Sequence, residues 1–204
     1  IEVTEYWQDK GRIGSRLELM HNSVKRRLQE TSQERIEARS LSDDRALDGV
    51  QIIAGALMLT QIQNIRVPDA GNGVQGLDVR DLLNSWEPSD QAALLQRPLF
   101  AQDIYSTVRF HHRSVKEYLA AQWFLKLLGQ EVSRRKVEEL FFRDQYGAQV
   151  VVPSLRPLLP WMAMGDSRIL EKVRRLAPEI VFEGGDPVKL PVDVRREILE
   201  QVCK

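Results

Sequence analysis

The chain has 204 residues, 43% of them hydrophobic and 28% charged, a composition that supports a folded core beneath a charged surface. Lysine plus arginine equals aspartate plus glutamate at 29 each, and this neutral balance argues against a dedicated nucleic-acid surface. The single cysteine, Cys203, excludes an internal disulfide, and no apolar run approaches the ~20 residues that span a bilayer, so the composition favours a cytoplasmic protein without a membrane span.

Two helices are predicted in the first third of the chain. Ser15 and Glu18 have the spacing of a capping box, and apolar residues follow on one face, which predicts a helix over residues 15–30. Residues 46–61 are apolar on most sides, a pattern typical of a buried helix. Either Asp43 or Asp44 is a plausible cap for it. Residues 1–7 form a short helix or the end of a linker.

The middle of the chain alternates short helical patterns with short apolar runs. It predicts a strand over residues 62–67, a glycine-rich loop over 68–76, a helix over 77–86 stopped by Pro88, and a helix over 89–96. Residues 99–100 and 105–112 are then predicted to pair as a β-hairpin across 101–104. The order of helices followed by a hairpin is that of a winged helix.

After Gly129 the sequence predicts only helices, broken by prolines. They cover residues 134–142, 153–164, 167–177 and 192–202. Pro157 and Pro160 lie too deep in the second of these for a regular helix, so we expect a kink or an interruption there. Repeated short helices favour the start of an α-solenoid, although no repeat period is clean.

The most informative stretch is residues 108–124, VRFHHRSVKEYLAAQWF. Apolar and polar residues alternate up to His112, as in a half-buried strand, so His112 is expected on the face of Phe110 and His111 on the opposite face. Ser114 and Glu117 have capping-box spacing and predict a helix that begins at Ser114 and continues to residue 128.

The pattern Phe-His-x-Ser-x-x-Glu-Tyr-Leu-Ala-Ala in this stretch resembles the winged-helix segment of NACHT-type STAND ATPases, which are nucleotide-switched signalling proteins. The tail, VVVPSLRPLLPW over residues 150–161, is similar to the helical segment that follows the winged helix in bacterial NACHT-like proteins. The resemblance implies a mainly α protein, with the end of a helical domain at 1–42, a winged helix with a small β-hairpin at 43–128, and a HEAT- or ARM-like helical arm at 129–204.

The resemblance also implies a role for His112, because the histidine at this motif position contacts the β-phosphate of bound ADP in the family. Imidazole can donate a hydrogen bond to phosphate and gain a charge near neutral pH. Without the resemblance, a strand-end histidine bonded to a backbone carbonyl is the simpler interpretation. Tyr118 and Ala120 are interpreted as packing residues.

The chain contains no G-x-x-x-x-G-K-[ST] phosphate loop, so we expect no catalysis and no tight nucleotide binding from it alone. It begins with Ile1, and we interpret it as a fragment of a longer ATPase. In that parent, ADP or ATP with Mg²⁺ would be bound by an upstream NTPase core, and homo-oligomerisation would follow an unknown trigger. Because bacterial members commonly act in antiphage defence, that trigger could be a phage protein.

The alternative is a non-catalytic winged-helix and helical-repeat scaffold that binds another protein. DNA binding is disfavoured because the candidate recognition helix, residues 77–86, has Arg80 as its only basic residue. The basic triplets at 25–27 and 134–136 are interpreted as solvated helix faces. The three histidines show no metal-ligand spacing.

Two further expectations concern the tail. Leu158 and Trp161 are predicted to be buried in the helical arm. Gly184, Gly185 and Asp186 are predicted to form a turn rather than a phosphate loop, because no Lys-Ser/Thr follows the glycines.

Overall fold

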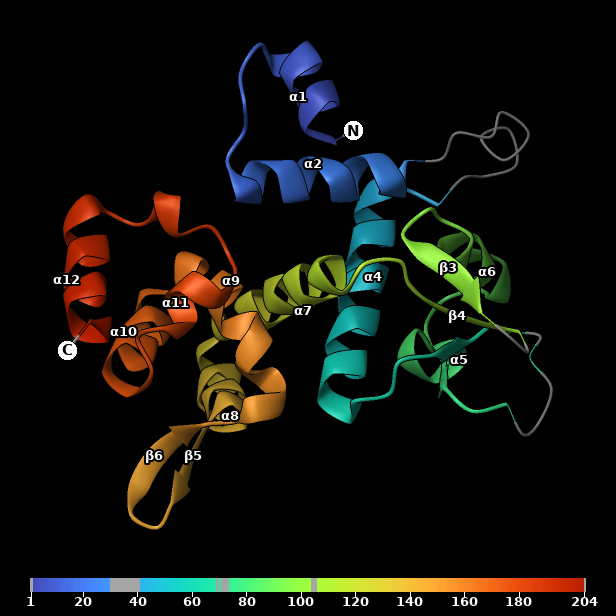
Figure 1. The fold of residues 1–204 in the computed structure, drawn as a ribbon. Helices are drawn as coiled ribbons and strands as arrows, with labels where there is room; N and C mark the ends of the chain where they lie inside the picture. The colour runs from blue at the N-terminus through green and yellow to red at the C-terminus, as the bar shows by residue number, and fades with distance from the viewer. Residues whose placement is uncertain (1, 30–40, 69, 71–73, 104–105, 204) are drawn as a thin grey trace.

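The computed structural model describes residues 2–29, 41–68, 70, 74–103 and 106–203, and the fold is mainly helical with two small sheets (Figure 1). The α-helices are α1 Glu2–Lys10, α2 Arg16–Leu28, α4 Asp43–Thr60, α5 Val79–Leu82, α6 Pro88–Leu95, α7 Arg113–Leu128, α8 Glu131–Phe141, α9 Leu159–Gly165, α10 Ser167–Leu176, α11 Ile180–Glu183 and α12 Val192–Val202. The 3-10 helices are η1 Pro153–Leu158 and η2 Pro187–Lys189. The strands are β1 Ile65–Arg66, β2 Leu77–Asp78, β3 Phe100–Asp103, β4 Thr107–Phe110, β5 Phe142–Gln145 and β6 Ala148–Val151.

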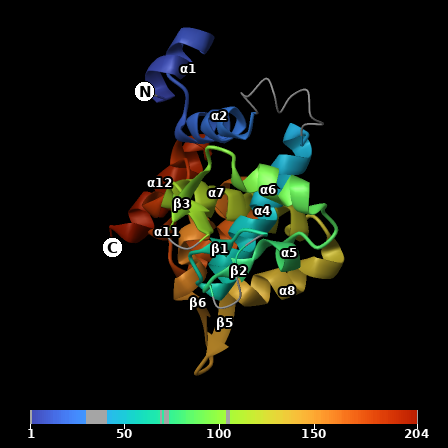
Figure 2. The same ribbon diagram turned by 90° about the vertical axis from the view of Figure 1, so that its right-hand side faces the viewer.

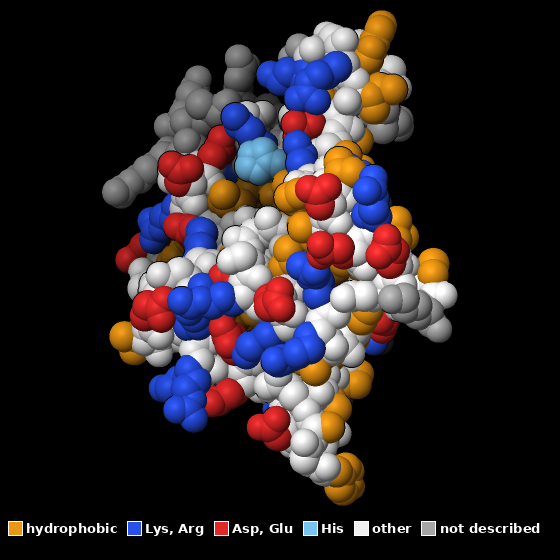
Figure 3. Space-filling model, turned by 90° about the vertical axis from the view of Figure 1, so that its left-hand side faces the viewer, with side chains coloured by type: hydrophobic (Ala, Val, Ile, Leu, Met, Phe, Trp, Pro, Cys, Tyr) orange, Lys and Arg blue, Asp and Glu red, His pale blue; other side chains and the backbone are white. Residues whose placement is uncertain are grey.

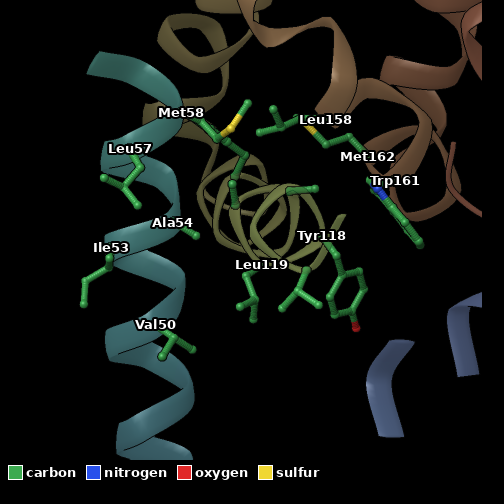
Figure 4. Packing of buried hydrophobic residues seen from close by; sticks show 14 of the residues in the cluster. Val50, Ile53, Ala54, Leu57, Met58, Tyr118, Leu119, Leu158, Trp161 and Met162 are labelled. Carbon is green, nitrogen blue, oxygen red and sulfur yellow. The ribbon is translucent and has the colours of Figure 1, made fainter. Parts of the chain in front are cut away.

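Helices α4 and α7 cross at the centre of the molecule and make the most extensive contact in it (Figures 1 and 4). The buried face of α4 carries Val50, Ala54 and Leu57, which confirms the prediction of a buried helix. The predicted cap is wrong, because the hydroxyl of Ser42 accepts the hydrogen bond from the Arg45 N–H and both aspartates lie inside the first turn.

A four-stranded sheet in the order β2-β1-β4-β3 lies beside these helices (Figure 2). The predicted hairpin is present as the antiparallel pair β3–β4, in which the Phe100 and Phe110 rings pack 4.8 Å apart. Its extent differs from the prediction, because β3 continues through residues 101–103, which were expected to form the turn. The turn residues 104 and 105 lie outside the described part of the chain, as do residues 69 and 71–73 of the predicted 68–76 loop.

The helix predicted over residues 77–86 is wrong in its extent. Leu77 and Asp78 form β2, which pairs in parallel with β1, and α5 then lasts for only four residues. Asp78 explains the change of structure, because its carboxylate caps α5 through the Arg80 N–H at 2.9 Å. Pro88 begins α6 instead of ending a helix, as proline is tolerated in a first helical turn.

The expectation of helices alone in residues 129–204 is also wrong. Strands β5 and β6 form a separate antiparallel hairpin that projects from the helices (Figure 1). Tyr146 and Gly147 both have positive φ, which matches the twist of a two-residue hairpin turn. Gly147 is the only residue of this pair that favours positive φ, and no Asn or Asp precedes it, so the sequence signal for the turn is weak.

The proline-rich segment is interrupted, as predicted. Pro157 lies in the 3-10 helix η1, and Pro160 lies in the first turn of α9, where its missing N–H costs no hydrogen bond. The final helix, α12, has the predicted bounds.

One cluster of buried apolar side chains is continuous from α2 to α12 and includes residues from all three predicted segments. At its N-terminal side, the capping box of Ser15 and Glu18 is confirmed. The division into segments 1–42, 43–128 and 129–204 stays a prediction.

Candidate functional site

The sequence-predicted site lies where the hairpin passes into α7. Strand β4 ends at Phe110 and α7 begins at Arg113, so His111 and His112 occupy the short connection. The predicted capping box is wrong, because the helix begins before Ser114 and its N-cap is His112, which makes no side-chain cap hydrogen bond. The Glu117 carboxylate instead accepts a hydrogen bond from Arg113 Nε at 2.6 Å.

His112 and His111 are both exposed, and their ring centroids lie 5.8 Å apart. The expectation that they face opposite sides of a strand is therefore not met. The His111 N–H still donates a hydrogen bond to the Leu99 carbonyl at 3.0 Å, but His112 is already the N-cap of α7, where the chain turns into the helix. His112 is at the start of α7, open to solvent, whereas His111 lines a pocket.

This pocket, which we call the junction pocket, has a volume of about 730 Å³. It is lined by Leu57, Met58, Gln61, Gln63, Ala101, Arg109, Phe110, His111, Arg113, Lys116, Glu117, Ser154 and Pro157. Its polar side therefore carries three basic groups, which are Arg109, Arg113 and Lys116, and one carboxylate, and its apolar side comes from α4 and Phe110.

Lys116 is the unusual member of the junction pocket, since it is only 7% exposed. Its ammonium donates a hydrogen bond to Gln63 Oε1 at 2.7 Å. Burial lowers the pKa of Lys116 from its usual value, because the charged form loses hydration. Sequence reasoning missed this residue, although a lysine between Val115 and Tyr118 on an apolar helix face was a visible signal.

The third histidine, His21, lies on α2 beside Tyr118 of α7. The Tyr118 hydroxyl is 3.4 Å from His21 Nδ1, at the edge of a second hollow of about 640 Å³. Burial raises the pKa of Tyr118. No group of His, Cys, Asp and Glu in the described residues could hold a metal ion.

The glycine-containing turn at 184–186 has a structural use. Gly185 has φ +61° and lies so close to the Pro160 carbonyl that a Cβ would come within 2.5 Å of its oxygen. Asp186 is buried, and its Oδ2 accepts a hydrogen bond from the Leu17 N–H at 3.0 Å. The carboxylate thus satisfies a free backbone donor in the first turn of α2.

Charged side chains of both signs are mixed over the face shown in Figure 3. The interpretation of residues 134–136 as a solvated face is wrong for Arg134, whose side chain is mostly buried and binds Asp166 at 2.7 Å and Glu138 at 3.3 Å. Arg80 likewise pairs with Asp78 at 2.6 Å. These pairs leave little surplus positive charge for nucleic-acid contact.

No protein-family model matches the chain, and no curated protein matches it significantly. Among the described helices, none is long and apolar enough to cross a membrane.

Proposed function

We propose that this chain is the regulatory winged-helix and helical-arm region of a NACHT-type STAND ATPase. The observation that carries the proposal is the order of elements α4, β1, β2, α5, α6, β3 and β4, in which the two-residue strand β2 is an addition and β1 pairs with the hairpin in one sheet. This is the order of a winged helix, and the motif that resembles the family occupies the passage from its hairpin into α7.

In the proposed mechanism, His112 faces an NTPase core on the same polypeptide and donates a hydrogen bond to the β-phosphate of ADP in the closed state. Its exposure at the start of α7 supports this role, because the ring is accessible and the nearby helix N-terminus favours an anion. ADP with Mg²⁺ would belong to that core. Exchange for ATP, prompted by a trigger such as a phage protein, would release the winged helix and permit homo-oligomerisation.

The test is the substitution His112→Ala in the full-length parent, with His111→Ala as the matched control. A lost hydrogen bond to a charged phosphate is worth ~1.5–3 kcal/mol, and each ~1.4 kcal/mol changes a two-state ratio about tenfold. We therefore expect the His112 variant to retain less ADP after purification and to oligomerise without trigger, whereas the His111 variant behaves as wild type. If the His112 variant kept full ADP occupancy and stayed monomeric without trigger, the proposed contact of His112 with ADP would be refuted.

The alternative proposal is a protein-binding scaffold without a nucleotide switch. The observation that favours it is the set of exposed apolar side chains on α12, which are Val192, Leu199 and Val202. A phosphate loop upstream of Ile1 in the parent, together with ADP in the purified parent, would decide for the switch.

A further inference from the structure

The junction pocket contains a buried cation, Lys116, that forms no ion pair with any carboxylate among the described residues. Three other lysines, Lys126, Lys172 and Lys189, are each more exposed than Lys116, and each pairs with a carboxylate. Lys116 instead binds the neutral amide of Gln63. A buried charge is costly in free energy unless it is paired. A buried lysine without a carboxylate therefore indicates a candidate anion-binding site.

The other charged groups around Lys116 add more positive than negative charge to the junction pocket. Glu117 is the one carboxylate in the described lining of the junction pocket, and it is already bound to Arg113. Arg109 also lines the junction pocket, 3.9 Å from Asp103, and remains largely exposed. The N-terminus of α7, which has no side-chain cap, adds the positive end of a 16-residue helix.

We propose that the junction pocket binds a phosphate group carried on a small organic body, with Lys116 at its base and Arg109 and Arg113 at its mouth. A phosphate offers three acceptor oxygens and up to two negative charges, which suits three cationic donors that come from a strand and a helix. The pocket is far larger than one phosphate, and its apolar wall of Leu57, Met58 and Phe110 would contact the organic body. This site is distinct from the proposed contact of His112 with ADP and does not rest on it.

The experiment titrates the 204-residue chain with phenyl phosphate at constant ionic strength and follows heat and backbone NMR shifts. We expect saturable binding that is at least tenfold weaker in Lys116→Met, which keeps the aliphatic stem and removes the charge. The control is Lys126→Met on the same helix, whose ammonium binds the exposed Asp48, and binding there should be unchanged. Absence of saturable binding, or equal binding by the two variants, would overturn the proposal.

A second pair of variants covers the case in which Lys116→Met does not fold. Arg113 is 78% exposed and pairs with Glu117 four residues on, and Arg135 is 90% exposed and pairs with Glu139 in the same spacing. Arg113→Gln should weaken phenyl phosphate binding several-fold, because it also releases the Glu117 carboxylate into the pocket. Arg135→Gln should not change it. Equal affinities in these two variants would again contradict the site.

Discussion

Gly55 of α4 lies directly against the indole of Trp123 on α7. A Cβ placed on Gly55 would come within 2.4 Å of the Trp123 ring, closer than any real contact of this kind. The missing side chain therefore lets the two central helices approach each other where they cross.

Gly55→Ala is expected to destabilise the protein by ~1–3 kcal/mol, the usual range for overpacking a core. The sign of the stability change is informative, because helix propensity alone would make the alanine variant more stable by ~1 kcal/mol. Urea denaturation should show a lower midpoint with an unchanged slope. Adding Trp123→Leu should reduce the cost of the alanine, as expected for two residues in contact. A more stable Gly55→Ala protein would mean that the helices can separate freely.

Trp161→Ala is expected to cost ~3–5 kcal/mol, as for other buried tryptophans truncated to alanine. The predictions that Trp161 and Leu158 are buried are confirmed, since Trp161 is 3% exposed and its ring packs edge-on against Tyr118 at 5.3 Å (Figure 4). Chemical denaturation measures the loss. Trp7→Ala is the control, because Trp7 is 56% exposed and its removal should change stability little.

Stability should fall in acid partly through Asp78. Hydrogen bonds from Arg80 hold the pKa of Asp78 at about 2, below the ~3.9 of an unfolded chain. A lowered carboxylate pKa stabilises the fold at all pH values above ~4, and this contribution, on the order of 2 kcal/mol, is lost as the pH falls from about 4 to 2.

Asp78→Asn should therefore be less stable than wild type at pH 7 and should lose less stability between pH 5 and pH 2. Thermal denaturation across this range gives both quantities. Asp48→Asn serves as the control, because the Asp48–Lys126 pair is exposed and such pairs contribute little. Parallel pH profiles for wild type and Asp78→Asn would contradict the assignment.

Apart from any phosphate contact in the junction pocket, the isolated chain should not bind ADP with micromolar affinity, and it should not hydrolyse ATP. It has no phosphate loop, and a single histidine supplies about one hydrogen bond, on the order of 1–3 kcal/mol. Calorimetric titration with ADP and Mg²⁺ checks this expectation in the Lys116→Met variant, whose junction pocket has lost its buried cation. Micromolar binding would place the nucleotide site within these residues and remove the need for an upstream core.

Local signals in the sequence predict most of the helices. The Ser15–Glu18 capping box and the all-round apolar pattern of residues 46–61 are local, and both helices form close to their expected bounds. The segment at residues 77–86 departs from prediction because pairing of Leu77 with Ile65, a tertiary contact, overrides helical periodicity.

The site was predictable only in part. The motif locates the passage into α7, but the side chains that meet there come from distant parts of the chain. Lys116 and Gln63 are 53 residues apart, and no spacing rule connects them. The expected alternation of His111 and His112 failed because it treated His112 as a strand residue, whereas His112 is the N-cap of α7.

The hydrogen bond from Leu17 to Asp186 bears on how the chain folds during synthesis. The two residues are 169 positions apart, and ribosomes add about 5–20 residues per second, so α2 waits roughly 10–30 seconds for the carboxylate that completes its first turn. Helix α2 therefore cannot complete its native hydrogen bonds until Asp186 has been synthesised. A nascent chain stalled before Asp186 emerges should expose α2 to proteases, and a chain stalled after Asp186 has emerged should protect it.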